Sequence, residues 1–157
     1  MIKKLIVFIG LVSFYYGHSQ VDIGINVGLP ISYWSKNDSS FSSALDIEYI
    51  GGKYEKSTLK LSSGLVYIKS TNEYLKDGMY FPLAITVETR IFGELNFGGS
   101  VGFGIGGVGF AGFYYRPYLV HELSNLANIL LSYRSVGRVG DSYAYLELGV
   151  SFKLWDK

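Results

Sequence analysis

The chain has 157 residues with 14 basic and 13 acidic side chains, and this near balance argues against a nucleic acid as a partner. It contains no cysteine, which excludes disulfides and thiolate metal sites and fits export to an oxidising compartment. Aromatic residues make up 17% of the chain, with 14 tyrosines, and 20 residues are glycine. Such a composition is found in membrane β-barrels and also in soluble β-sandwiches.

Residues 1–19 have the three parts of an export signal. Lys3 and Lys4 give a positive start, an apolar core follows, and small residues precede a cut after Ser19. A cut one residue later and a retained N-terminal anchor are the alternatives, although the apolar core is shorter than the ~20 residues of a membrane-spanning helix. The remainder, 20–157, has 12 basic and 13 acidic residues because both signal lysines are lost. By length it is a single domain.

Eight segments after the signal alternate apolar and polar residues, which predicts strands with one apolar and one polar face. In the first, every odd position is aliphatic. The lengths match the ~9–11 residues that a tilted strand needs to cross a bilayer. In the sixth segment the facing is ambiguous, because Tyr114, Tyr115, Arg116 and Tyr118 blur the alternation. The predicted strands are residues 21–31, 43–50, 57–69, 79–91, 94–104, 110–121, 126–136 and 143–154.

The connections between these strands fit an up-and-down order with both termini on one side. No segment shows a sustained helical period, so all connections are predicted as loops or turns. Outward loops of such barrels are longer than the turns on the side of the termini. The first two outward connections follow this rule, and the third is short. The outward connections are roughly 32–42, 70–78, 105–109 and 137–142, and the inward ones are roughly 51–56, 92–93 and 122–125.

The predicted fold class is all-β: an eight-stranded antiparallel up-and-down transmembrane β-barrel after a cleaved signal peptide, with lipid outside and polar residues inside. A soluble barrel also alternates, with apolar residues inside. The mixed charges of the polar face favour the membrane form, because the interior of eight strands is narrow and filled by side chains that can neutralise one another. We predict an interior ion-pair network of Asp46, Glu48, Lys60, Glu88, Arg90, Glu94, Arg134 and Glu147.

Several short segments carry a family resemblance: residues 24–30, 81–83 (Phe-Pro-Leu), 112–117 (Gly-Phe-Tyr-Tyr-Arg-Pro), 132–134 and the last strand. With them, the chain resembles the small outer-membrane β-barrel domain proteins common in Bacteroidetes. More distantly, it resembles the eight-stranded barrels of outer-membrane proteins A and X. The resemblance covers essentially the whole mature chain. It implies an outer-membrane location among lipid and lipopolysaccharide, and for most members it implies no known chemistry.

The last strand also resembles the signal that the barrel-assembly machinery reads. That signal is a polar residue, any residue, Gly, two of any kind, an aromatic residue, any residue and a hydrophobic one. Glu147, Gly149, Phe152 and Leu154 match it. The chain continues for three residues past Leu154 instead of ending on an aromatic residue. The resemblance implies the assembly machinery as a partner.

One set of residues suggests nucleophilic catalysis. His121 is the one histidine outside the signal, and with Ser124 and Glu147 it resembles the Ser-His-acid set of the lipid A deacylases, which are small outer-membrane barrels. A base must lie within hydrogen-bond reach of the serine. That family places Ser two residues after His, whereas the spacing here is three, and the Asn-Pro-Gly segment that usually follows is missing. We expect a turn at this position instead.

Two further patterns point to no cofactor and no metal. Gly102, Gly104 and Gly107 match G-x-G-x-x-G, but a dinucleotide site needs a helix after the motif, and another apolar, glycine-rich strand follows. We expect glycines that face the interior near a hairpin. With one histidine and no cysteine after the signal, only carboxylates remain as metal ligands, and their spacing shows no calcium loop.

The function predicted is a non-catalytic, monomeric outer-membrane barrel with a structural or interaction role and no wide aqueous channel. Trp34, Phe41 and Tyr74 are candidates for a small exposed contact surface. Three alternatives stay open. They are a lipid A-modifying hydrolase, a soluble periplasmic barrel that binds a small apolar ligand, and a narrow solute or ion path through a gap in the interior network.

Overall fold

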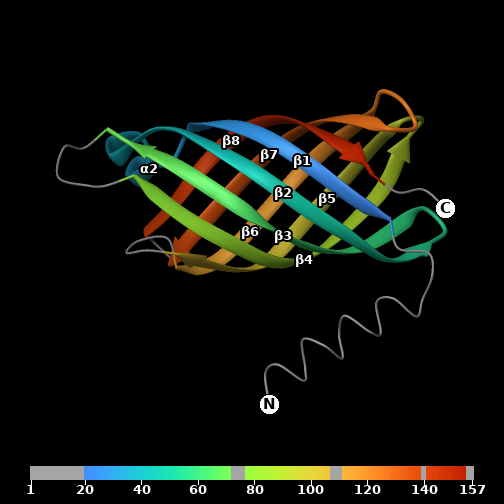
Figure 1. Cartoon of the computed structure of the whole chain (residues 1–157), viewed down its shortest axis with the longest axis horizontal. Coiled ribbons are helices and arrows are strands. Elements are labelled where there is room, and N and C mark those ends of the chain that lie inside the picture. The colour runs from blue at the N-terminus through green and yellow to red at the C-terminus, as the bar shows by residue number, and fades with distance from the viewer. Residues whose placement is uncertain (1–19, 72–76, 107–110, 139–140, 155–157) are drawn as a thin grey trace, which may run out of the picture.

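The computed structural model describes residues 20–71, 77–106, 111–138 and 141–154. The described part forms a closed barrel in which each strand pairs antiparallel with the next and β8 pairs with β1 (Figure 1). The eight-stranded up-and-down barrel is therefore confirmed, while the predicted signal peptide lies outside the described residues. The strands are β1 (Val21–Pro30), β2 (Ser39–Tyr54), β3 (Ser57–Ser70), β4 (Gly78–Phe92), β5 (Leu95–Gly106), β6 (Gly112–Glu122), β7 (Ala127–Arg138) and β8 (Asp141–Lys153).

A short helix, α2 (Tyr33–Asp38), lies where the sequence predicts a loop. Six residues are too few to show a helical period, but the helix is capped at its start. The backbone N–H of Ser35 donates to Ser32 Oγ at 3.2 Å, and the backbone N–H of Ser32 donates to Ser35 Oγ at 3.0 Å. Nothing in the described part of the chain is a helix long and apolar enough to cross a membrane.

Strand β2 is longer at both ends than the predicted segment 43–50. Its pairing with β3 shifts register between Ser39 and Phe41 and again between Ile50 and Gly52. Each shift interrupts the two-residue alternation, and for that reason the sequence pattern stops before the strand does. The expected first outward loop and first inward turn shrink accordingly.

The two faces of each strand differ as the alternation predicts. On β4, Phe81, Leu83 and Ile85 are each more than half exposed on the outside, with exposed fractions of 53–57%. Between them, Pro82 and Ala84 are buried inside the barrel. The apolar face of the sequence is thus the outer surface of the barrel, which is the reverse of a soluble protein.

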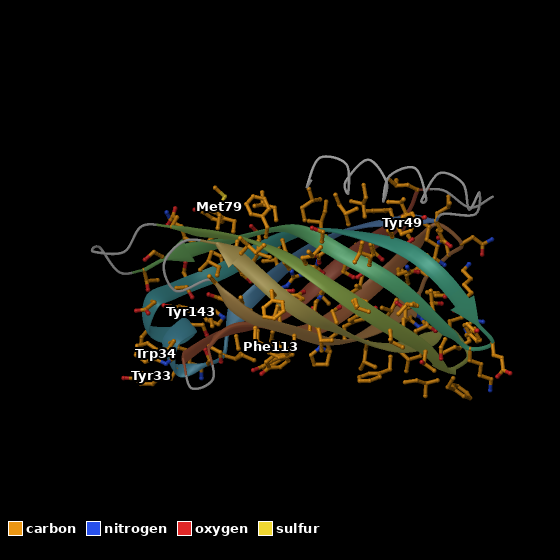
Figure 2. The ribbon with its side chains drawn as sticks, turned by 90° about the horizontal axis from the view of Figure 1, so that it is seen from below. Tyr33, Trp34, Tyr49, Met79, Phe113 and Tyr143 are labelled. Carbon is orange, nitrogen blue, oxygen red and sulfur yellow. The ribbon has the colours of Figure 1, made fainter. Side chains whose placement is uncertain are left out.

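The facing of β6, which the sequence leaves ambiguous, is settled by the structure. Tyr114, Arg116 and Tyr118 are buried inside, whereas Phe113 and Leu119 lie on the outside, where Figure 2 shows Phe113 pointing away from the ribbon. Tyrosine is common at membrane interfaces as well as in filled interiors, so its position in an alternating pattern does not reveal which face it occupies.

The outer surface is a predominantly apolar band, with single polar residues such as Ser63 and His121 among its outward positions. Among the described side chains, the outward positions of the eight strands carry no Asp, Glu or Arg, and their one Lys, Lys69, lies at the end of β3. Large apolar residues from every strand fill the band, including Ile25, Ile47, Leu61, Ile85, Val101, Phe113, Leu131 and Leu148.

The interior is not polar throughout, which corrects the sequence-based expectation. Near the end that carries α2, eight buried residues pack into an apolar cluster inside the barrel, and several of them are tyrosines. Each of the eight residues lies in the part of its strand that is nearest the outward connections. This outer interior cluster consists of Ala44, Val66, Ile68, Tyr80, Ala84, Tyr114, Val136 and Tyr145.

Glycines on the inner face make room for large neighbours. A Cβ atom added at Gly98 would collide with the ring of Tyr118, whereas one added at Gly99 on the outer face meets nothing within 4 Å. We expect Gly98→Ala to lower the free energy of unfolding by about 1–3 kcal/mol through overpacking. Gly99→Ala, the matched control, should be neutral or slightly stabilising. Urea unfolding in lipid vesicles measures both variants, and equal losses would contradict this account of the interior.

Candidate functional site

The middle of the interior holds a compact group of buried charges. Arg134 donates from Nη1 and Nη2 to both carboxylate oxygens of Asp46, at 3.0 and 2.6 Å, and from Nε to Glu147 Oε2 at 2.7 Å. Arg116 Nη1 lies 2.8 Å from Asp46 Oδ2. These four residues, the central cluster, have equal numbers of acids and bases, and two-point Arg–carboxylate contacts are among the strongest ion pairs.

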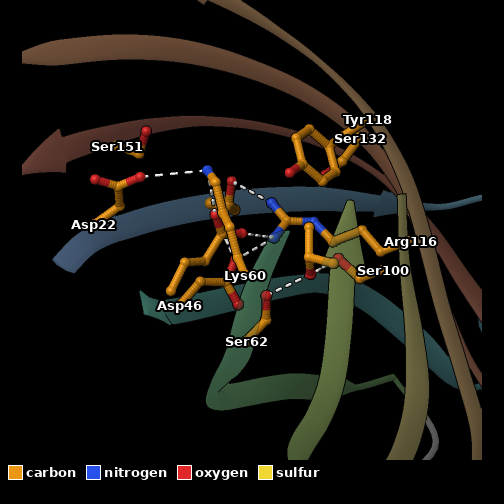
Figure 3. Close-up of polar contacts among 12 residues, drawn as sticks. Asp22, Asp46, Lys60, Ser62, Ser100, Arg116, Tyr118, Ser132 and Ser151 are labelled. Carbon is orange, nitrogen blue, oxygen red and sulfur yellow. Dashed lines mark hydrogen bonds and ion pairs between the residues drawn. The ribbon is translucent and has the colours of Figure 1, made fainter. Parts of the chain in front are cut away.

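A second group of charges surrounds a lysine. Lys60 Nζ, on β3, lies 3.3 Å from Asp22, 3.0 Å from Glu48 and 2.9 Å from Glu88, which come from β1, β2 and β4. Figure 3 shows Lys60 reaching toward Asp22, with Arg116 on its other side. In this lysine cluster three acids surround one base, so it carries two surplus negative charges.

A cavity of about 510 Å³ opens beyond the lysine cluster. It lies at the end of the barrel where β1 begins and β8 ends, and Figure 1 shows these two strand ends side by side. At its mouth Arg90 Nη2 lies 3.2 Å from Glu122 Oε2, and Lys153 Nζ lies 3.8 Å from Glu122 Oε1. Asn96 Nδ2 joins the mouth to the lysine cluster, because it donates to Glu122 at 3.2 Å and to Glu88 at 3.0 Å.

The structure brings most of the predicted network residues together. Those that lie inside and form ion pairs are Asp46, Glu48, Lys60, Glu88, Arg134 and Glu147. Arg90 lies at the cavity mouth with its side chain 54% exposed. Glu94 is exposed in the turn between β4 and β5 and forms no ion pair with a described side chain. Its placement in the interior is therefore corrected, because β5 begins one residue later than predicted.

The predicted network leaves out several charges that lie inside the barrel, among them Asp22, Arg116 and Glu122. Asp22 occupies an even position of the first predicted strand, so the alternation itself was sufficient to place it inside. Arg116 was missed because the facing of its strand was ambiguous. Glu122 was assigned to a turn, although it is the last residue of β6 and its side chain lines the cavity.

The candidate hydrolase residues are not brought together. His121 is exposed on the outer face of β6, and Glu147 is fully buried inside on β8. Ser124 lies in the turn before β7, where its Oγ accepts from the backbone N–H groups of Leu126 and Ala127 at 3.2 and 3.1 Å. This hydroxyl stabilises a turn, and no base approaches it within the described part.

The other motifs have similarly structural settings. Gly102 lies in β5, and a Cβ there would collide with the backbone of Leu83 on β4; Gly107 lies outside the described residues. Gly149 has the same role against Asn26. No group of three or more His, Asp or Glu that could hold a metal occurs among the described residues.

The short helix α2 lies at the outer end of the barrel and is attached to β8. Ser35 Oγ donates to the carbonyl of Ala144 at 2.8 Å, and Tyr143 Oη donates to Asp38 Oδ2 at 2.9 Å. The helix presents Tyr33 and Trp34, whose rings meet edge to face at 5.5 Å (Figure 2). Of the predicted contact surface, Trp34 and Phe41 are exposed, and Tyr74 lies outside the described residues.

One ion pair closes the base of the second outward connection. The Asp77 carboxylate accepts hydrogen bonds from the hydroxyl of Tyr67, from Lys69 Nζ at 3.0 Å and from the backbone N–H of Ser70 at 3.0 Å. These bonds favour the charged form and lower the pKa of Asp77 to about 2. Asp77 is therefore ionised at neutral pH.

No protein-family model matches the chain, and no curated protein sequence matches it. Solved structures of small transmembrane β-barrels are similar in fold. The designed barrel TMB2.3 is 12% identical with a TM-score of 0.61, over 88% of this chain and 97% of that one. The Yersinia pestis attachment invasion locus protein Ail is 13% identical with a TM-score of 0.58, over 88% and 99%.

A second structure of Ail, in complex with the heparin analogue sucrose octasulfate, is 16% identical with a TM-score of 0.57, over 87% of this chain and 98% of that one. At such identities the likeness concerns the fold alone. The chain thus has the fold of a small transmembrane β-barrel. Membership of the families that its sequence resembles stays a prediction.

Proposed function

We propose that this chain is a non-catalytic, monomeric outer-membrane β-barrel with a structural or interaction role at the bacterial envelope. The uncharged apolar band around a closed barrel with a charged interior carries this proposal. Such a surface is far larger than the apolar patches of soluble monomers, and it matches the lipid-facing band of outer-membrane barrels. Outer-membrane lipid and lipopolysaccharide are its surroundings.

The two ends of the sequence support delivery to that membrane. Residues 1–19 match an export signal of the Sec type. On β8, Glu147, Gly149, Phe152 and Leu154 match the signal of the barrel-assembly machinery, which we propose as a transient partner.

Cell fractionation tests the proposal, followed by gel electrophoresis of boiled and unboiled samples. We expect the protein in the outer-membrane fraction, with a mobility that changes on heating because a closed barrel resists detergent until it is boiled. Recovery in the periplasmic fraction without detergent would overturn the proposal and revive the soluble barrel.

The filled interior predicts that the protein is not a general pore. The outer interior cluster and the central cluster occupy the barrel between the cavity and α2, with Tyr80, Tyr145 and Arg134 fully buried. An eight-stranded barrel leaves no wide channel. We expect no large, stable currents from the purified protein in planar bilayers, with a known porin as the positive control. Such currents would contradict the filled interior.

An interaction role would be exerted at the outer end. Ail was solved with a heparin analogue, but the described outer end here offers few cations. Lys36 is exposed on α2, and Lys69 is paired with Asp77. The exposed Tyr33 and Trp34 therefore suit an aromatic contact better than a polyanion.

A further inference from the structure

The cavity at the end opposite α2 has the size and lining of a small-molecule site. Its volume of about 510 Å³ lies within the range of about 300–1,000 Å³ that is usual for ligand pockets. Ile50 is the one apolar residue among the described residues that line it. The lining therefore does not suit an apolar ligand, and its charges decide which ligand it fits.

The floor of the cavity is negative. Asp22, Lys60 and Glu88 line it, and Glu48 contacts Lys60 from behind. This is the lysine cluster, in which three carboxylates surround one ammonium group at 2.9–3.3 Å. Arg116 of the central cluster also lies 3.9 Å from Glu48 Oε1. Because the central cluster is itself neutral, the two clusters together still carry two surplus negative charges.

The rim of the cavity is positive. Four basic side chains line it and face two acidic ones, which leaves two surplus positive charges. Glu122 is shared between Arg90 and Lys153. The basic residues of the rim are Lys53, Lys56, Arg90 and Lys153, and the acidic ones are Glu55 and Glu122.

The wall between floor and rim includes two buried amides and the hydroxyl groups of Ser57 and Thr58. Asn96 and Asn128 both line the cavity, and only 6% and 5% of their surfaces are exposed. Asn96 Nδ2 donates to Glu88 and to Glu122, and Asn128 Nδ2 donates to Ser151. Their Oδ1 atoms are buried and accept no hydrogen bond within the described part. Both Oδ1 atoms are too deeply buried to contact a ligand, so the charges of the floor and the rim decide what the cavity can bind.

The cavity is closed toward α2. The central cluster and then the outer interior cluster, with Tyr80, Tyr114 and Tyr145, lie between the cavity and the outer mouth, and all of these residues are buried. A ligand therefore enters and leaves at the end where β1 begins, and the site binds rather than transports.

We propose that this cavity binds a small zwitterion, an amino acid or a short peptide, with its ammonium group toward the floor and its carboxylate at the rim. A simple cation would satisfy the floor and leave the rim cations unpaired, and a simple anion would do the reverse. A molecule with a charge of each sign at its two ends satisfies both. The proposal goes beyond the envelope role and does not depend on it.

Isothermal titration calorimetry of the purified full-length barrel in detergent micelles tests the site. The probe is the dipeptide L-alanyl-L-alanine, compared with its N-acetyl form, which lacks the ammonium group, and its C-terminal amide, which lacks the carboxylate. We expect saturable binding of the dipeptide with a Kd of about 1 mM or tighter, and binding of each blocked form at least about tenfold weaker.

Variants of the floor and the rim test which end of the dipeptide each of them binds. At the exposed rim, Lys56→Gln and Arg90→Gln should weaken binding of the dipeptide. They should leave binding of the amide form unaffected, because the amide has no carboxylate for these cations to contact. Glu88→Gln should weaken the dipeptide and leave the N-acetyl form unaffected. Lys36→Gln, which removes an exposed lysine from α2 at the opposite end, is the matched control. Heat-dependent gel mobility shows whether each variant is folded. If Glu88→Gln does not fold, the two rim variants alone test the proposal.

Three results would each overturn the proposal: no saturable binding of the dipeptide, equal affinity for the blocked forms, or an equal loss in the Lys36→Gln control. These outcomes differ from a failure of the envelope role, which fractionation would detect, because a protein found outside the membrane can still bind the dipeptide.

Discussion

Arg134→Met should lower the free energy of unfolding by about 3–5 kcal/mol, the usual cost of leaving buried charges without their partner. Arg134 is fully buried and is the one base that contacts both Asp46 and Glu147 among the described residues. Methionine fills a similar volume, so the loss reports the charge rather than a cavity. Urea unfolding of the barrel in lipid vesicles, followed by tryptophan fluorescence, measures the change.

The matched control for this variant is Arg90→Gln. Arg90 also pairs with a carboxylate, Glu122, but its side chain is half exposed at the cavity mouth. Exposed pairs contribute about 0–1 kcal/mol, and the control should stay within that range. If both arginine variants lost the same stability, the central cluster would not be the charge-paired interior described above.

Ile85→Arg should lower the free energy of unfolding in bilayers by about 2–4 kcal/mol, the cost of placing arginine on a barrel surface at the bilayer midplane. Ile85 is 57% exposed on the outer face in the middle of β4, and the neighbouring outward residues Leu83 and Val87 are apolar. The same unfolding measurement in vesicles detects the loss.

Depth provides the control for this second variant. Ile91 also faces outward but lies one residue before the end of β4, so Ile91→Arg should cost only about 0–1 kcal/mol near the interface. If Ile85→Arg is as stable as the parent, the apolar band does not contact hydrocarbon. That result would favour a soluble barrel over a membrane-embedded one.

The two variants probe opposite sides of the same wall. On the inner side, each buried charge is stabilised by an oppositely charged partner. The outer side is stable in lipid because its apolar band carries no charge that would have to be desolvated. A strand that separates lipid from such an interior must alternate strictly, and any interruption must lie near the strand ends. The register shifts of β2 at Ser39–Phe41 and Ile50–Gly52 are placed in this way.

The sequence by itself determined the number of strands, their order and which face of most of them is apolar. Alternation with a period of two depends on local pattern alone, and the central parts of all the strands except the sixth show it clearly. It also placed Asp46, Lys60, Arg134 and Glu147 inside, because each occupies a polar position within such a pattern. Where the pattern is interrupted, as at the ends of β2, or where the segment is short, as in α2, the prediction was incomplete.

Only the tertiary structure decided how the interior is layered. Residues that lie far apart in the sequence meet there, such as Asp46 with Arg134 and Asp22 with Lys60, and closure of the barrel sets which charges share a level. Alternation tells which face a residue occupies, not how deep it lies along the barrel axis or which strand is its neighbour. The outer interior cluster, the neutral central cluster and the cavity with its negative floor and positive rim all depend on that depth, and for this reason no reading of single strands could reveal them.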